Sequence, residues 1–517
     1  MKKATVLLKN TILLATSNII LRLLALLLQS FLAGKIGAEN LGLFGIISSL
    51  GVVFATISIS GVRFGTTRLV SEEEGRGNKN PHSLMRCAFV YSLIFGFASG
   101  GVLYSAANIF SRYWVMNVSA STALRIIAIS MPFVAFGSVI EGYFTAKQKI
   151  FRLVTMQIIA QLLRIIFVVS CFSRPANRNI IDTLSLGMLI GEISLTIGGI
   201  LLYFIDTAGK KEENPQKGNF VRLIKTSLPL AISAYMRTGL SSLGQIIIPH
   251  GLKKGGMGSK SAFATYGVVS QMSMPVIMFP AALLNALGEV LIPRLTAAQI
   301  QGRKIGISYI VNRALRLGVI FSFGVAGVMF FYSQPLGRTI YKSIEAGEYI
   351  RIFAPLVPIV YIDCVTDGCL KGLNQQVYSM VYNVLEGVIN VVLLFLLLPK
   401  TAIMGYVMVM YIKELFNAVL SIRRLRKVTQ VDIMSWGMTS SVISLWGAKV
   451  LCDTMRLSAP LGIIILVYIS FYVTLLYILS AVSREDIRWV FSLIKADNEE
   501  KAPKKPIIGV DKTVVSR

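Results

Sequence analysis

Apolar segments long enough to cross a lipid bilayer recur along the whole sequence. A transmembrane helix needs about 20 mostly apolar residues, and about fourteen segments meet that criterion. Because 54% of the residues are hydrophobic and only 15% are charged, a soluble protein is excluded. The sequence therefore predicts an all-α polytopic membrane protein. The predicted spans lie near residues 7–33, 41–66, 84–109, 121–147, 152–173, 182–206, 222–249, 262–290, 306–333, 347–371, 376–398, 401–424, 436–455 and 459–482.

One stretch within these spans occurs twice. Residues Arg125 to Gln148 read RIIAISMPFVAFGSVIEGYFTAKQ, and residues Arg351 to Asn374 read RIFAPLVPIVYIDCVTDGCLKGLN. The two copies align without a gap and lie in the fourth and tenth predicted spans. Such a repeat is typical of a transporter built from two similar halves. The matched arginine, proline, acid and glycine are Arg125, Pro132, Glu141 and Gly142 in the first copy and Arg351, Pro358, Asp367 and Gly368 in the second.

The net charge of +27 invites a nucleic-acid interpretation, but the basic residues lie mostly between the apolar segments. In that position they orient helices against the cytoplasmic surface. With the N-terminus inside, the cytoplasmic loops hold more Lys and Arg than the external loops. We therefore expect a multi-pass protein of the cell membrane with both termini in the cytoplasm. It should contact membrane lipids and no nucleic acid.

A polar, turn-rich segment from Asp206 to Asn219 (DTAGKKEENPQKGN) separates the sixth and seventh predicted spans. We interpret it as a cytoplasmic linker between two six-helix lobes, to which the last two spans are an addition. The segment from Ser483 to Lys495 mixes apolar and charged residues as an interfacial amphipathic helix does. The predicted divisions are an N-terminal lobe (1–206), the linker (207–220), a C-terminal lobe (221–427), two extra spans (428–482), and an amphipathic helix with a disordered cytoplasmic tail (483–517).

No motif of a soluble enzyme is present in the sequence. The only two histidines, His82 and His250, fall in predicted loops on opposite faces, which leaves no histidine-based metal site or triad. A GxxxxGK[ST] phosphate loop is also missing. We expect neither catalytic residues, nor a bound metal, nor a cofactor, and proton or sodium coupling remains open.

Two arginines are the leading candidates for substrate binding. Arg22 in the first span and Arg237 in the seventh both fall near mid-membrane, where a charge needs a wet cavity or a partner. Two guanidiniums, one from the start of each lobe, would suit an anionic diphosphate, because each donates in a planar fork. The alternative is that each arginine pairs with a buried acid and only fixes helix packing. Arg63, near the cytoplasmic end of the second span, is a candidate entrance residue.

The remaining charged residues within spans have two interpretations. Asp363 and Asp367 lie one turn apart on one helix face and could form a proton or cation site, with Glu141 as a further candidate. Alternatively, Asp367 pairs with Lys371, and Glu141 with a residue such as Lys147. Opposite charges on adjacent spans favour pairing within the membrane over substrate or ion binding. These charges are Arg164 and Glu192 in the fifth and sixth spans, and Glu386, Lys413 and Glu414 in the eleventh and twelfth.

Three motifs resemble the polysaccharide exporters of the MATE-like (MOP) superfamily, in particular the stage V sporulation protein B group, which is related to lipid II flippases. They are GKIGAENLGLFG at Gly34–Gly45, SGVRFGTTRLVSEEEGRGN at Ser60–Asn78, and LRIIAISMPFVAF…EGYFTAKQK in the fourth span. The resemblance covers Ala4 to Val482. It implies two six-helix lobes in a V shape, alternating access, and cavity arginines that hold a diphosphate. Arg22 falls where that group has a basic residue, whereas Gln29 stands where the group usually has an arginine.

The expected function is flipping or exporting an undecaprenyl-diphosphate-linked oligosaccharide or cell-wall precursor, and the expected partners include polysaccharide or peptidoglycan synthesis enzymes. One alternative is a cation-coupled multidrug or small-molecule antiporter of the same superfamily. Such an antiporter would use the acids to bind cations, and the arginines would be unfavourable for cation binding. A membrane-embedded glycosyl transferase or polymerase is a third interpretation. It would need a sizeable loop bearing acids or histidines, which the sequence lacks.

Overall fold

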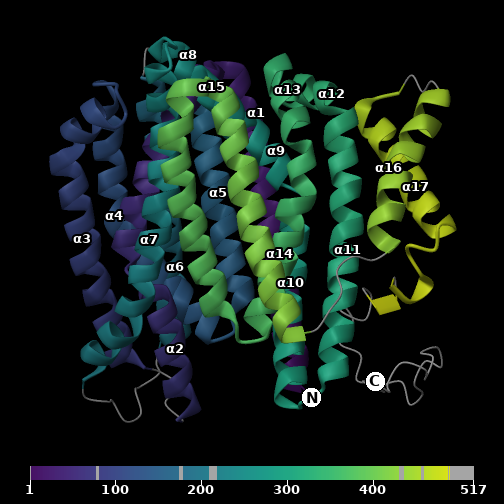
Figure 1. Cartoon of the computed structure of the whole chain (residues 1–517). Coiled ribbons are helices and arrows are strands. Elements are labelled where there is room, and N and C mark those ends of the chain that lie inside the picture. Colours follow the sequence, from purple (N-terminus) through teal and green to yellow (C-terminus); the bar gives the residue numbers. More distant parts are fainter. Residues whose placement is uncertain are drawn as a thin grey trace.

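The computed structural model describes residues 2–76, 81–173, 179–208, 218–429, 436–455, 459–486 and 488–489. These residues form a bundle of long helices without a strand, which confirms the predicted all-α class (Figure 1). The first part contains α1 (Lys2–Ile59), α2 (Val62–Gly75), α3 (His82–Tyr113), α4 (Ala120–Ala146), α5 (Ile150–Ser173) and α6 (Ile180–Thr207). The second contains α7 (Asn219–Lys254), α8 (Ser259–Tyr266), η1 (Gly267–Ser273), α9 (Met274–Met278), α10 (Ala281–Ile300), α11 (Lys304–Phe331), α12 (Ser333–Tyr341), α13 (Ile344–Phe353), η2 (Ala354–Leu356), α14 (Val357–Gly372) and α15 (Gln376–Thr429), and is followed by α16 (Trp436–Thr454) and α17 (Leu461–Ile478).

Two continuous helical stretches each contain two predicted spans. In α1 the direction changes at Gly37, whose φ of 75° favours glycine. In α15 it changes at Ala402, three residues after Pro399. Within the described residues, ten helical segments are long and apolar enough to cross a membrane, and α1 and α15 belong to two of them. We call the end of the bundle where α1 begins the proximal side, and the end with the two kinks the distal side (Figure 1).

The eighth predicted span is not a single helix, so that prediction was wrong in detail. The tenth falls within one candidate membrane span, Ile344–Gly372, although it is not one regular helix. The eighth is divided into α8, the π-helix η1, α9 and α10, and α10 continues to Ile300. The tenth is interrupted by the 3-10 turn η2, which contains Pro355. Proline lacks the amide donor that a continuous helix requires. In the first copy of the repeat, Ile129 stands at that position, and α4 runs unbroken through Pro132.

The repeated glycines lie at two equivalent helix crossings. A Cβ on Gly142 of α4 would lie 2.6 Å from the carbonyl oxygen of Arg63 in α2. A Cβ on Gly368 of α14 would lie 2.7 Å from the Cα of Gly288 in α10. The helices α2 and α4, and likewise α10 and α14, pack along each other. The glycine of each copy therefore lets the fourth span of its half pack closely against the second.

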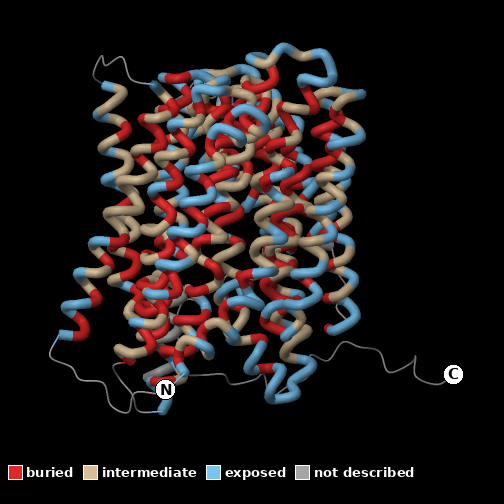
Figure 2. The backbone as a smooth tube through the Cα atoms, turned by 90° about the vertical axis from the view of Figure 1, so that its left-hand side faces the viewer, coloured by how far each residue is buried: buried red, intermediate tan, exposed pale blue. Residues whose placement is uncertain are grey.

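The helices fall into two packed groups that share α1. Helices α2 to α6 pack mainly on one another, as do α7, α10, α11, α14 and α15, while α1 contacts α3, α4 and α5 as well as α7, α8, η1 and α10. Figure 2 shows the buried residues concentrated inside the bundle. Large apolar side chains such as Phe97, Ile166 and Leu466 are exposed on the outer surface, where lipid chains would cover them.

The two extra helices, α16 and α17, pack against α11. The Tyr472 hydroxyl donates to the Ile320 carbonyl across this contact at 2.8 Å. After α17, the backbone N–H of Ser483 donates to the Asp486 carboxylate at 2.9 Å, and the Asp486 N–H donates to the Ser483 hydroxyl at 3.2 Å. These reciprocal bonds resemble a helix capping box. Most of the predicted amphipathic helix, and all of the tail after it, lie outside the described residues.

Candidate functional site

Arg22 of α1 and Arg237 of α7 line one cavity of about 670 Å³, which we call the arginine cavity. Both side chains are exposed to it. Within the described residues, neither guanidinium has a carboxylate at ion-pair distance, so the buried acid partners considered as an alternative are not observed. The two cations are therefore available to an anionic ligand. The cavity is lined by Ala15, Asn18, Arg22, Arg237, Ala282, Asn285, Ala286, Gly288, Glu289, Ile292, Asp363, Cys364, Asp367, Gly368 and Lys371.

Carboxylates occupy the wall of the arginine cavity formed by α10 and α14. Asp367 pairs with Lys371 at 2.9 Å and accepts a hydrogen bond from the Ser379 hydroxyl. Asp363, one turn earlier, accepts a hydrogen bond from Asn417 of α15 at 3.0 Å. The two acids are thus held by different partners. The cavity has a cationic side on α1 and α7 and an acidic side on α10 and α14.

Sequence reasoning missed Glu289, which also lines the acidic side. The predicted eighth span ended at residue 290, which placed this acid at a helix terminus. Because α10 continues for another ten residues, Glu289 instead lies within the helix. The signal available in the sequence was the apolar run after Glu289, namely Val290, Leu291 and Ile292.

Arg63 and Glu141 do not line the cavity but form an ion pair between α2 and α4, with 3.3 Å between Nη1 and Oε2. Gln157 of α5 donates to the other carboxylate oxygen at 2.7 Å. Lys147, the expected partner of Glu141, instead lies 3.7 Å from Glu74. The acid of the first repeat copy is therefore engaged in a contact among three helices.

The charged residues of adjacent spans also lie outside the cavity lining. Lys413 contacts Glu386 at 2.8 Å and Glu414 at 2.6 Å, which joins the two arms of α15. Arg164 of α5 packs its aliphatic stem against Gly191 of α6, and Glu192 lies within electrostatic range of this arginine. Among the described residues, Arg164 and Glu192 do not approach to ion-pair distance. No group of three or more potential metal ligands is found in the described part of the chain.

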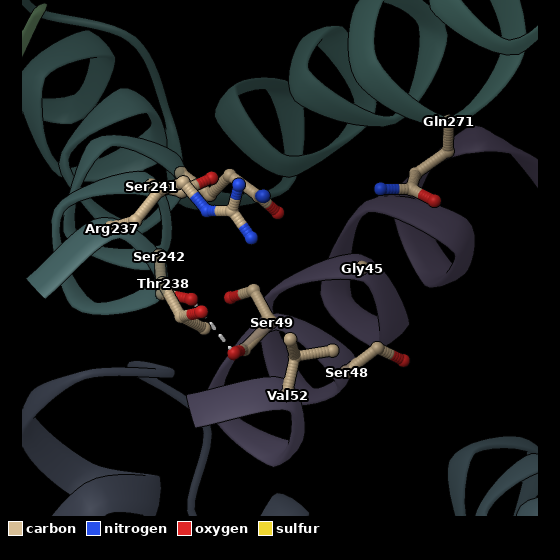
Figure 3. Close-up of a pocket in the computed structure, with 10 residues that line it drawn as sticks. Gly45, Ser48, Ser49, Val52, Arg237, Thr238, Ser241, Ser242 and Gln271 are labelled. Carbon is tan, nitrogen blue, oxygen red and sulfur yellow. Dashed lines mark hydrogen bonds between the residues drawn. The ribbon is translucent and has the colours of Figure 1, made fainter. Parts of the chain in front are cut away.

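Arg237 also lines a second cavity of about 410 Å³, which we call the hydroxyl pocket (Figure 3). Hydroxyl and amide side chains make up most of its polar lining. Gln271 of η1 accepts a hydrogen bond from Gln29 at 3.1 Å, so the residue that replaces the expected arginine positions a side chain of this pocket. The lining residues are Gly45, Ser48, Ser49, Val52, Arg237, Thr238, Ser241, Ser242, Gln245 and Gln271.

On the distal side, α1 and η1 are in backbone contact. A Cβ on Gly42 would clash with the carbonyl oxygen of Phe263, and a Cβ on Gly267 would clash with that of Ala38. The neighbouring apolar side chains, including Leu43 and Phe263, belong to one buried cluster that joins both groups of helices. This contact packs α1 tightly against η1 at the distal end of the bundle.

On the proximal side, α7 packs against α2. Arg222 of α7 forms ion pairs with Glu72 at 3.2 Å and with Glu73 at 2.9 Å. Gly61 and Gly65 leave no room for a Cβ beside Ser227 of α7. The first half of α7 is therefore anchored to the first group of helices, and its second half packs on α15 through Gly244 and Gly251.

Comparisons with known proteins show what this chain is similar to. The sequence profile described as "Polysaccharide biosynthesis protein" matches residues 7–299, and the profile described as "MatE" matches residues 254–396. Stage V sporulation protein B of Bacillus subtilis (strain 168) is 23% identical over 445 residues, which cover 82% of this chain and 85% of that protein. Lipid II flippase MurJ of the same organism is 20% identical over 427 residues, which cover 75% and 76%. A solved structure of lipid II flippase MurJ in an inward closed conformation matches with a TM-score of 0.66 and 15% identity, over 90% of this chain and 98% of that one.

Proposed function

We propose a function for this chain, which belongs to the polysaccharide biosynthesis protein family. It flips an undecaprenyl-diphosphate-linked oligosaccharide or cell-wall precursor across the cell membrane by alternating access. It is a transporter and not an enzyme, in line with its similarity to lipid II flippase MurJ. Its multiple spans make it an integral membrane protein. The two arginines of the arginine cavity support an anionic substrate.

The observation that carries the proposal is the pair of exposed guanidiniums, Arg22 and Arg237, in one cavity between α1 and α7. A charge within a membrane protein is costly unless it meets water or a counterion. Each guanidinium can donate two parallel hydrogen bonds to phosphate oxygens. A diphosphate that bridges the two arginines would neutralise both, while its lipid chain stays in the bilayer.

We propose that transport runs from the cytoplasmic to the outer leaflet. With both termini in the cytoplasm, the proximal side faces inward and the contact between Gly42 and Gly267 lies near the outer face. The head group would enter the arginine cavity from the cytoplasm, and separation of α1 from η1 would release it outside. The lipid tail would stay in the bilayer, beside α16 and α17.

Reconstitution tests the proposal directly. Vesicles containing the protein and a fluorescent undecaprenyl-diphosphate sugar are assayed for exchange of the lipid between leaflets. We expect Arg22→Ala and Arg237→Ala each to slow the exchange at least about tenfold, because each removes charge-assisted hydrogen bonds. Arg112→Ala, in the last turn of α3 and outside both cavities, is the matched control. Unchanged exchange in a folded Arg22→Ala/Arg237→Ala protein would refute the diphosphate-binding role.

A second candidate function is cation-coupled antiport of a small molecule, favoured by the acids of the arginine cavity. Asp363, Asp367 and Glu289 could bind protons or sodium ions on the side opposite the arginines. Collapsing the proton or sodium gradient across the vesicles distinguishes the two functions. Loss of transport of a cationic dye together with its gradient would favour the antiporter, whereas exchange of the diphosphate lipid without any gradient would favour an uncoupled flippase.

A further inference from the structure

The hydroxyl pocket adjoins the arginine cavity at Arg237, the one residue that lines both. Figure 3 shows the Arg237 guanidinium directed across the pocket toward Gln271, whose side-chain nitrogen faces the same space. Any ligand bound to Arg237 from the arginine cavity therefore has the hydroxyl pocket next to it. This position makes the pocket a candidate site for whatever chemical group follows the diphosphate.

The pocket differs from the arginine cavity in its charge. Its lining contains four serines, one threonine and two glutamines. It contains no carboxylate, and Arg237 is its one cation. Serine and threonine hydroxyls both donate and accept hydrogen bonds, and glutamine amides donate through nitrogen and accept through oxygen. Saccharide hydroxyl and acetamido groups have the same mixed character. The lining is thus complementary to an uncharged sugar.

Contacts behind the pocket hold its two glutamines in place. The Gln271 oxygen accepts from Gln29 at 3.1 Å, and the Gln245 oxygen accepts from the Tyr266 hydroxyl at 3.1 Å. Gly45 is part of the same arrangement, because a Cβ there would clash with the Gln271 amide. In Figure 3 the Gln271 amide nitrogen faces the pocket, where it can donate to a ligand. Fixed donors of this kind reduce the entropy lost when a polar ligand binds.

We infer that the hydroxyl pocket binds the sugar attached to the diphosphate, and that it selects an uncharged sugar over an acidic one. The inference rests on the proposed function, in which Arg22 and Arg237 hold the diphosphate. With Arg237 neutralised in this way, a sugar carboxylate in the pocket would face only neutral groups. Burying a charge without a counterion is much more costly than burying a hydroxyl that finds a partner.

The test compares three fluorescent lipids in proteoliposomes: undecaprenyl diphosphate, the same lipid carrying N-acetylglucosamine, and the same lipid carrying glucuronic acid. We expect wild-type protein to exchange the N-acetylglucosamine lipid at least about tenfold faster than the glucuronic acid lipid. Ser241→Ala and Gln271→Leu should each slow the N-acetylglucosamine lipid roughly fivefold, because one neutral hydrogen bond is lost. Both variants should leave exchange of the sugar-free lipid unchanged.

Ser233→Ala, on the same helix but outside the pocket, is the matched control. Equal rates for the neutral and acidic sugars in wild-type protein would overturn the selectivity, and this measurement needs no variant. An equal effect of Ser241→Ala and Gln271→Leu on all three lipids would overturn the sugar site and leave the flippase function intact. If wild-type protein exchanges none of the lipids, the proposed function itself fails and this inference fails with it.

Discussion

Gly42 of α1 and Gly267 of η1 let two backbones touch on the distal side of the cavities. A Cβ on Gly267 would clash with the Ala38 carbonyl, so alanine cannot replace this glycine without separating the helices. We expect Gly267→Ala to shift the protein toward a state that is open on the distal side. Gly34→Ala is the control, because a Cβ there meets no atom within 4 Å.

Spin labels on cysteines at Val118 and Lys260, both exposed on the distal side, measure this opening. In a background without the native cysteines, the distance distribution should move to longer values for Gly267→Ala and stay as in the parent protein for Gly34→Ala. A Gly267→Ala protein with the parent distribution would show that the contact between α1 and η1 does not control access.

The ion pair of Arg63 with Glu141 is expected to stabilise the packing of α2 on α4 and to play no direct part in substrate binding. A double-mutant cycle with Arg63→Gln and Glu141→Gln should give a coupling energy of about 0.5–3 kcal/mol in thermal unfolding, since the two groups are in contact. Folded Arg63→Gln should still exchange the diphosphate lipid. Loss of exchange without loss of stability would indicate that Arg63 takes part in substrate transport.

Lys413 is expected to stabilise the folded protein, because it pairs with both Glu386 and Glu414. Removing one partner of a buried ion pair costs about 3–5 kcal/mol. Lys413→Met should therefore unfold at a markedly lower temperature in detergent. The triple variant Lys413→Met/Glu386→Gln/Glu414→Gln should recover most of the stability, because no unpaired charge remains. If Lys413→Met is as stable as wild type, Glu386 becomes a stronger candidate for ion binding.

Hydropathy predicted the membrane class and most helix positions, and the resemblance of three motifs predicted the relationship to the MATE-like superfamily. The structure and the sequence matches confirm these predictions. Hydropathy could not predict the break at η1, because the seven residues of η1 contain no proline. For η2 a signal was present in the sequence, because Pro355 stands where the first copy, in the unbroken α4, has Ile129.

Side-chain pairing was less predictable than helix position. Reasoning along one helix found the contact of Asp367 with Lys371, because these residues are four apart. For Glu141 it proposed Lys147, further along the same segment, whereas the actual partners come from α2 and α5. The crossing and rotation of neighbouring helices decide such contacts, and a single sequence does not contain them. The roles of Arg22 and Arg237 in binding remain predictions.

The segment after α17 is expected to detach from the bundle at low pH through Asp486. The Asp486 carboxylate is buried and accepts hydrogen bonds from Arg313 and Ser483, each at 2.8 Å. Burial alone would raise the pKa of Asp486, but these hydrogen bonds outweigh it and hold the pKa below the usual range. A lowered folded-state pKa stabilises the attachment above the unfolded value of about 3.9, and this contribution is lost as the pH falls through the folded value.

Asp486→Asn removes the charge and should weaken the attachment by about 1.5–3 kcal/mol at pH 7. Amide hydrogen exchange of residues 479–486, measured in detergent for wild type and Asp486→Asn, should differ most at neutral pH and converge below about pH 4. Glu485→Gln is the control, because Glu485 is exposed and lies 3.4 Å from the same arginine. A difference between wild type and Asp486→Asn that persists undiminished at pH 3 would show that the charge of Asp486 does not hold the segment to α11.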